Sequence, residues 1–167
     1  MPYQANIIAY AFVKKGIEEN KPVTQMKLQK LVFFAHGVYM AFNNNTPLIQ
    51  EDFEAWQFGP VVGSIYLEYK TYGNQPINRK NPDLENRLKD LYKDEGAMVA
   101  INYTWNVTKN LSASTLSNWT HTKGSPWETF YTPGLTSVQI DNLAISKYFK
   151  QLLESANDAR QPATPIS

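Results

Sequence analysis

The two histidines, His36 and His121, are the side chains in this sequence best suited to acid–base chemistry near neutral pH. A general base needs a positioned partner, and three residues downstream of His121 are candidates: Ser125, Glu128 and Asp141. Their spacing does not require such a pair, and the simpler interpretation is that His121 hydrogen-bonds a loop while Trp127 fills the core. His36 falls on the flank of an apolar helix, where a structural histidine is the more common outcome. We therefore expect no catalytic residue.

Motifs for metals and cofactors are missing from the sequence. There is no cysteine, which excludes disulfides, thiolate metal sites and cysteine nucleophiles. The two histidines do not have the HExxH spacing of a zinc site, and no P-loop, GxGxxG or GxSxG segment is present. We expect no metal and no cofactor.

Aromatic residues cluster around Gly59-Pro60 and offer a different chemistry, which is protein binding. Tryptophan and tyrosine often act as anchors in protein interfaces, although burial in the core is an open alternative for this cluster. Lys27 and Lys30 lie at helical spacing and could form half of a basic patch, while a solvated helix flank is the ordinary explanation for them. The candidate partner-binding residues are Lys27, Lys30, Trp56, Phe58, Gly59, Pro60, Tyr66, His121 and Trp127.

The stretch that must position these residues is a predicted central helix at about 23–42. At about 100° per residue, one face carries Leu28, Leu31, Val32, Ala35, Val38, Tyr39 and Phe42. A second, opposite line carries Met26, Phe33, Gly37 and Met40. A helix that is apolar on two sides needs neighbours on both, so this helix is expected in the middle of the domain. Thr24 is a suitable N-cap, and Gly37 is tolerable where another backbone packs closely.

The rest of the pattern predicts a mostly α (α+β) fold in a single helical domain. Pro47–Ile49 and 53–58 have the features of two strands, which predicts a small β-hairpin at about 47–58 that Gly59-Pro60 terminates. Further helices are expected at about 4–17, 61–72, 84–92, 98–105, 112–119, 126–130 and 141–153. Residues 1–155 are the expected domain, and 156–167 the expected flexible C-terminal tail.

Composition limits the classes of function. A length of 167 residues suits one domain, and a net charge of +1, from 16 basic and 15 acidic residues, argues against a protein built to grip nucleic acid. The charges in MPYQANIIAYAFVKKG follow the apolar run, unlike those of a signal peptide, and no apolar stretch approaches the ~18 residues of a membrane span. We expect a cytoplasmic protein.

Several segments together resemble the Panacea domain, the SocA-like antitoxin family that is also described as phage-associated or GepA-like. They are KLQKL at 27–31 running into 34–35, FEAW at 53–56, GPVV at 59–62, Thr120-His121, Pro126-Trp127 and the closing helix near 148–149. The resemblance spans about 5–153, matches 74–110 only loosely, and has Phe58 where tyrosine is at least as common.

The resemblance implies an antitoxin that neutralises a cognate toxin by direct, non-catalytic protein binding. The toxin is typically encoded by the adjacent gene, and it can be blocked or marked for removal. Some relatives carry an additional DNA-binding segment, which is not visible in this sequence. The alternatives are a phage-encoded regulator that binds a host protein or nucleic acid, and an enzyme that depends on His121.

Overall fold

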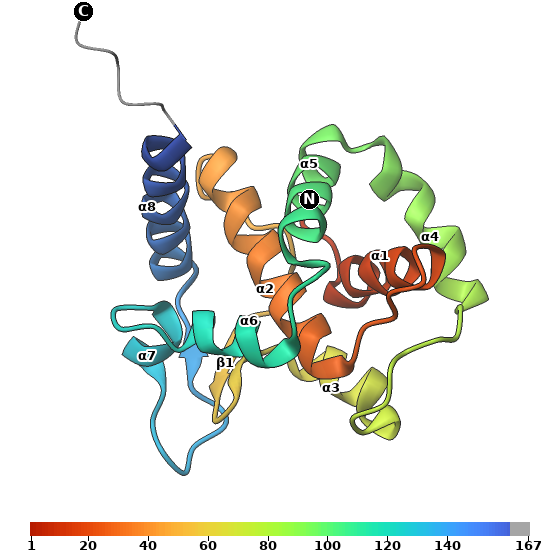
Figure 1. The fold of residues 1–167 in the computed structure, drawn as a ribbon, viewed down its shortest axis with the longest axis horizontal. Helices are drawn as coiled ribbons and strands as arrows, with labels where there is room; N and C mark the ends of the chain where they lie inside the picture. The colour runs from red at the N-terminus through yellow and green to blue at the C-terminus, as the bar shows by residue number, and fades with distance from the viewer. Residues whose placement is uncertain (161–167) are drawn as a thin grey trace, which may run out of the picture.

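Helix α2 (Gln25–Phe42) lies at the centre of the fold, as its two apolar stripes predict (Figure 1). The computed structural model describes residues 1–160, with side chains through 156. The side chain of Thr24 caps α2 by accepting a hydrogen bond from the N–H of Lys27 at 3.3 Å. Both stripes are buried except for Tyr39, which is half-buried, and for Met26 and Phe42 at the helix ends, which are exposed. The predicted central helix is therefore confirmed.

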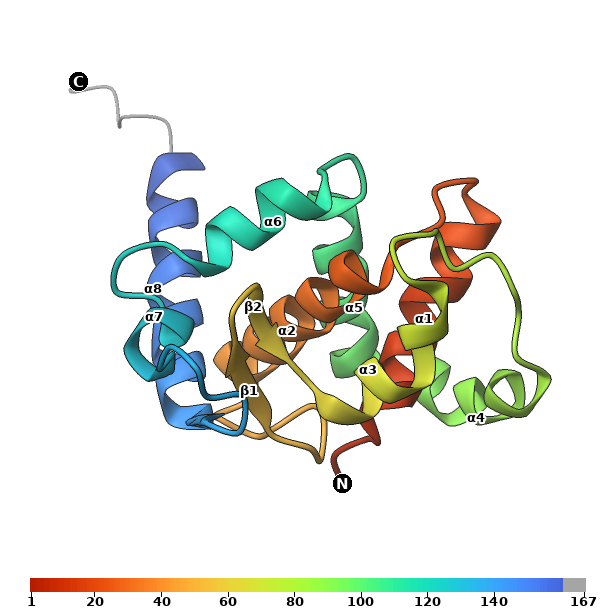
Figure 2. The ribbon, with the colours of Figure 1, turned by 90° about the horizontal axis from the view of Figure 1, so that it is seen from below.

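Seven further α-helices and a short 3₁₀ segment surround α2 in the described part of the chain. They are α1 (Ala5–Glu18), α3 (Gly63–Tyr69), η1 (Lys70–Tyr72), α4 (Pro82–Lys93), α5 (Glu95–Thr108), α6 (Ala113–Thr120), α7 (Pro126–Phe130) and α8 (Asn142–Arg160). α2 contacts α1, α3, α5, α6 and α8 (Figures 1 and 2). The chain is thus mostly α-helical, with α2 as the shared packing partner.

Local sequence explains where several of these helices begin. Ser112 and Ser125 each accept a hydrogen bond from a backbone N–H three residues on, and Pro126 occupies the first turn of α7. The break between α4 and α5 falls at Asp94, between the helices expected at 84–92 and 98–105. Asp94 caps α5 through the N–H of Ala97 at 3.0 Å, and an aspartate cap is a stronger helix start than a glycine.

The small sheet differs from the predicted hairpin at 47–58. Strands β1 (Phe53–Trp56), β2 (Gly59–Val61) and β3 (Gln139–Ile140) form an antiparallel sheet in the order β2-β1-β3. Ile49 instead forms an isolated parallel bridge with Tyr3. Gly59-Pro60 opens β2 where we expected it to end a strand, because β2 is an edge strand and an edge proline needs no N–H partner.

Most of the expected C-terminal tail at 156–167 lies outside the described residues. Helix α8 continues through 156–160, and 161–167 lie outside the described residues. None of the helices in the described part of the chain has the length and apolar character needed to cross a membrane. Among the side chains of residues 1–156, no group of three or more histidine or acidic residues is arranged to hold a metal ion.

Gly37 lies where α8 packs against α2. A Cβ at this position would overlap the aromatic ring of Phe149, coming within 2.5 Å of its Cγ. The nearest neighbour of Gly37 is therefore the Phe149 side chain. Phe149 is fully buried, with its ring 5.6 Å from Phe33 and 5.3 Å from Phe34 between ring centroids.

His36 is a fully buried structural residue, as predicted. Its Nε2 lies 2.9 Å from Oδ1 of Asn142, and its Nδ1 faces the N–H of Ile49 at 3.4 Å. An N–H at Nε2 and a lone pair at Nδ1 satisfy both contacts, so the neutral ring fits this site. Burial lowers the pKa of His36 from 6.5 to about 4.

This burial should make the fold sensitive to mild acid. Between pH 6.5 and 4 the unfolded chain binds the proton that folded His36 excludes, so the free energy of unfolding should fall with decreasing pH, by up to about 3 kcal/mol. Urea denaturation at pH 7, 6 and 5 measures this slope. His36→Gln should flatten this slope. Equal slopes in wild type and His36→Gln would contradict the assignment.

Candidate functional site

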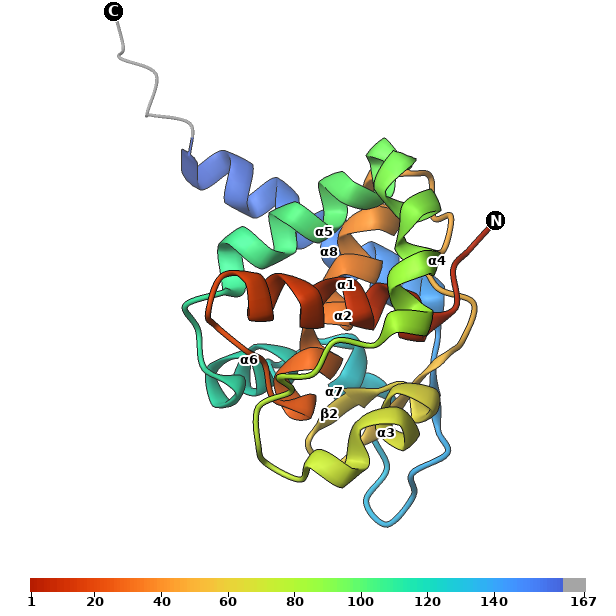
Figure 3. The same ribbon diagram turned by 90° about the vertical axis from the view of Figure 1, so that its right-hand side faces the viewer.

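An apolar groove of about 570 Å³ lies where the first turns of α2 meet the β1–β2 hairpin and α3. These three elements come together at one end of the molecule (Figure 3). We call this site the hairpin groove. Its lining comprises Thr24, Gln25, Met26, Gln29, Lys30, Trp56, Gln57, Phe58, Val61, Tyr66, Gly73, Asn74, Ala113 and Thr136. This lining brings together four of the predicted partner-binding residues, namely Lys30, Trp56, Phe58 and Tyr66.

The aromatic cluster forms the rim of the hairpin groove. Phe58 is 60% exposed and Tyr66 is 39% exposed. Trp56 is half-buried, donates from its Nε1 to Glu54 at 2.8 Å, and meets the ring of Tyr66 edge to face with centroids 5.1 Å apart. The alternative of a wholly buried cluster is therefore wrong for these three side chains, which lie at or near the surface.

Lys30 is the most unusual side chain in the hairpin groove. It is 1% exposed, which contradicts the solvated flank expected of a helix lysine. Gly59 makes room for it, because a Cβ there would lie 2.7 Å from Cε and 3.0 Å from Nζ of Lys30. Burial lowers the pKa of Lys30 to about 8. No ion pair or hydrogen bond reaches its ammonium from residues 1–156.

His121 and Trp127 lie behind the hairpin and support its turn. The Nε1 of Trp127 donates to the carbonyl of Trp56 at 2.5 Å, and Nε2 of His121 lies 3.2 Å from the carbonyl of Gln57. The two rings pack with centroids 3.8 Å apart. The hydroxyl of Ser125 donates to the carbonyl of Thr120 at 2.8 Å, away from His121. His121 thus positions the aromatic rim through the backbone.

The remaining predicted binding residues lie in the sheet (Gly59 and Pro60) and beside the end of a helix (Lys27). Gly59 and Pro60 form β2, where Pro60 pairs with Ala55 across the hairpin. Lys27 does not line the hairpin groove. Its ammonium donates to the carbonyls of Lys109 and Leu111, at 3.1 and 2.8 Å, just beyond the end of α5. A lysine at that position satisfies carbonyls left open by the helix terminus.

Gln29 is a buried neighbour of Lys30 that was not among the predicted binding residues. Its buried side chain makes two hydrogen bonds with the backbone of Val62: it donates to the carbonyl at 3.1 Å and accepts from the N–H at 2.9 Å. These bonds attach the end of β2 to α2 beside Lys30. The position of Gln29 between two apolar stripes could have indicated its burial, and a buried glutamine needs a hydrogen-bond partner.

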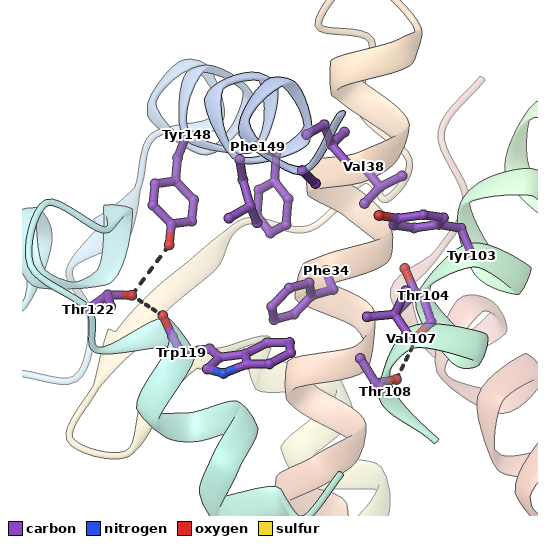
Figure 4. Close-up of a pocket in the computed structure, with 13 residues that line it drawn as sticks. Phe34, Val38, Tyr103, Thr104, Val107, Thr108, Trp119, Thr122, Tyr148 and Phe149 are labelled. Atoms are coloured by element: carbon purple, nitrogen blue, oxygen red, sulfur yellow. Dashed lines mark hydrogen bonds between the residues drawn. The ribbon is translucent and has the colours of Figure 1, made fainter. Parts of the chain in front are cut away.

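A second apolar hollow, of about 390 Å³, lies among α2, α5, α6 and α8 (Figure 4). Phe34 and Trp119 face each other across it with ring centroids 5.8 Å apart, and Tyr148 approaches from α8. None of the predicted partner-binding residues lines this hollow. Helix α6 separates it from the hairpin groove, contributing Ala113 to the groove and Trp119 to the hollow.

These features define a mostly helical domain with a small antiparallel sheet and an apolar surface groove, and comparison with known proteins gives its family. Residues 28–128 match the family described as antitoxin SocA-like, Panacea domain, and the chain belongs to this family. It is also similar to antitoxin SocA of Caulobacter vibrioides (strain NA1000 / CB15N), with 30% identity over 129 residues that cover 74% of this chain and 68% of the relative. No solved structure matches. The predicted family is therefore confirmed.

Proposed function

We propose that this chain is an antitoxin that neutralises a cognate toxin by direct, non-catalytic binding at the hairpin groove. Membership of the SocA-like family supports the antitoxin role, and the toxin is expected from the adjacent gene. Residues 1–155 act as one binding domain in this proposal. The observation that carries the proposal is the exposed aromatic rim of Trp56, Phe58 and Tyr66 around an apolar groove.

The rim has the chemistry of a protein-binding surface. Exposed aromatic side chains around a concave apolar site are typical anchors for a partner, because they bury a large area with little loss of rotamer entropy. The rim is also held in place, since Trp127, His121 and Gln29 fix the hairpin backbone. A pre-positioned rim lowers the entropic cost of association.

The contacts of His121 and Ser125 favour this proposal over the hypothesis of an enzyme. No hydrogen bond in the described part of the chain joins His121 to Ser125, Glu128 or Asp141, and both ring nitrogens of His121 face backbone carbonyls. The near-neutral net charge likewise favours a protein partner over nucleic acid.

A rescue assay with the adjacent gene tests the proposal. Expression of that gene alone should stop growth, and co-expression with this chain should restore growth and yield a co-purifying complex. Phe58→Asp should abolish rescue and weaken the complex at least 100-fold, because a carboxylate would have to be desolvated at the centre of the interface. Circular dichroism should show an unchanged fold, since Phe58 is exposed.

Leu143→Asp is the matched control, because Leu143 is 63% exposed and does not line the hairpin groove. It should rescue as well as wild type. Full rescue by Phe58→Asp would overturn the groove as the binding site. A harmless neighbouring gene, together with no complex, would overturn the antitoxin role. Retardation of DNA that weakens steeply between two salt concentrations would favour the nucleic-acid regulator instead.

A further inference from the structure

We infer that Lys30 is a carboxylate anchor: an aspartate or glutamate side chain of the toxin, flanked by apolar residues, enters the hairpin groove and pairs with its ammonium. This inference rests on the proposed function, because it specifies the chemistry of the partner at the same site. It gives Lys30 a role in recognition, because the chain, as far as the structure describes it, supplies no partner for this buried ammonium.

The first argument is the unmatched charge. The ion pairs in the described part of the chain involve Lys14 and Lys109, and none involves Lys30. The groove lining contains no acidic residue, and the pKa of Lys30 is lowered by burial without an opposing carboxylate. A buried charge is normally paired, so an unpaired one in a cleft indicates a ligand of opposite charge.

The second argument is access. Lys30 lines the hairpin groove. In the described part of the chain, two side-chain atoms are fully enclosed and have no hydrogen-bond partner, Asn6 Oδ1 and Thr104 Oγ1, and Nζ of Lys30 is not one of them. The ammonium of Lys30 is therefore not fully enclosed, and a carboxylate in the groove can approach it.

The third argument concerns the other residues that line the groove with Lys30. Met26 and Val61 supply apolar surface, and Trp56 and Tyr66 supply aromatic surface, so the groove suits a carboxylate that is flanked by apolar residues. A side chain within a segment fits this arrangement better than a chain terminus, which has a neighbour on one side only. A lysine ammonium is a compact charge with three donors and matches a single carboxylate.

Two small probes test the anchor on the free protein. 3-Phenylpropionate carries an aromatic ring and a carboxylate, and 3-phenylpropionamide is its neutral counterpart. Titrations followed by NMR at the amides of Gly59 and Val61 should show that the protein binds the acid at least tenfold more tightly than the amide at pH 7. Lys30→Met should remove this preference, and Lys89→Met, an exposed control on α4, should keep it. Equal binding of acid and amide by wild type would overturn the anchor.

The affinity for the acid should also decrease between pH 7 and 9, because the free ammonium loses its proton near pH 8. Tyr66 on α3 is the other titratable group in the lining, while the lining residues of the hairpin and α6 carry no titratable side chain. Tyr66→Phe should therefore keep the pH dependence. A pH-independent affinity for the acid would overturn the anchor.

Rescue assays separate this inference from the proposed function. Loss of rescue in both Phe58→Asp and Lys30→Met supports both proposals. Loss in Phe58→Asp with full rescue by Lys30→Met overturns the anchor and leaves the groove as the binding site. A Gly-Gly-Ser extension of the toxin's C-terminus should leave rescue intact, and loss of rescue would overturn the choice of a side-chain carboxylate.

Discussion

Gly37→Ala should lower the free energy of unfolding by about 3 kcal/mol, although alanine is the better helix former. The added methyl group would overlap the ring of Phe149, and neither α2 nor α8 can yield without disturbing buried neighbours. Overpacking of this kind destabilises the fold by more than the roughly 1 kcal/mol that the higher helix propensity of alanine contributes. Urea denaturation of wild type and variant measures the difference.

A double-mutant cycle identifies the ring as the cause. Phe149→Leu removes the aromatic edge above position 37, so Gly37→Ala should cost much less in that background. Gly96→Ala is the matched control, since a Cβ at Gly96 meets its nearest neighbour at 3.6 Å, an ordinary contact. It should leave stability unchanged or slightly higher. An equal cost of Gly37→Ala in both backgrounds would show that the ring is not responsible.

Lys30→Met should stabilise the free protein by about 2 kcal/mol at pH 7. Folded Lys30 has a pKa of about 8, below the ordinary lysine value of 10.5, so the unfolded chain binds more protons between these two pH values. At about 1.4 kcal/mol per pH unit, burying the charge costs roughly 3 kcal/mol below pH 8. Methionine fills most of the same volume without a charge.

The sign of the effect gives a second measurement. In wild type, the free energy of unfolding should rise between pH 8 and about pH 10, because unfolded Lys30 binds a proton that the folded side chain has lost. In Lys30→Met this rise should be missing. Lys89→Met, on the exposed side of α4, should change neither stability nor slope. Destabilisation by Lys30→Met at pH 7 would mean that the buried ammonium already has a stabilising partner within the chain.

The helices were predictable from the sequence because their signals are local. Two apolar stripes and the Thr24 cap predicted α2, and Ser112 and Ser125 marked the starts of α6 and α7. The sheet was less predictable. Gly59-Pro60 has the local features of a strand end, and only pairing with 53–56 makes it a strand. β3 at 139–140 pairs with β1 although the two strands are far apart in sequence, and local periodicity carries no information on such a pairing.

The candidate site was partly predictable for the same reason. Aromatic composition near Gly59-Pro60 identified Trp56, Phe58 and Tyr66, which the structure brings together at one groove. The burial of Lys30 was not predictable, because the residues that enclose it come from the hairpin and α6. Helical spacing places a lysine on a face of its own helix, and only the tertiary fold determines what covers that face.

The central position of α2 also affects the order in which the chain can fold during synthesis. Residues 25–42 leave the ribosome well before α8, which covers one side of α2 and begins about 100 residues later. At roughly 5–20 residues per second, the side of α2 that α8 covers remains open for roughly 5–20 s, whereas α1 is already present and α5 follows sooner. That apolar side of α2 is therefore open to non-native contacts until α8 has been synthesised.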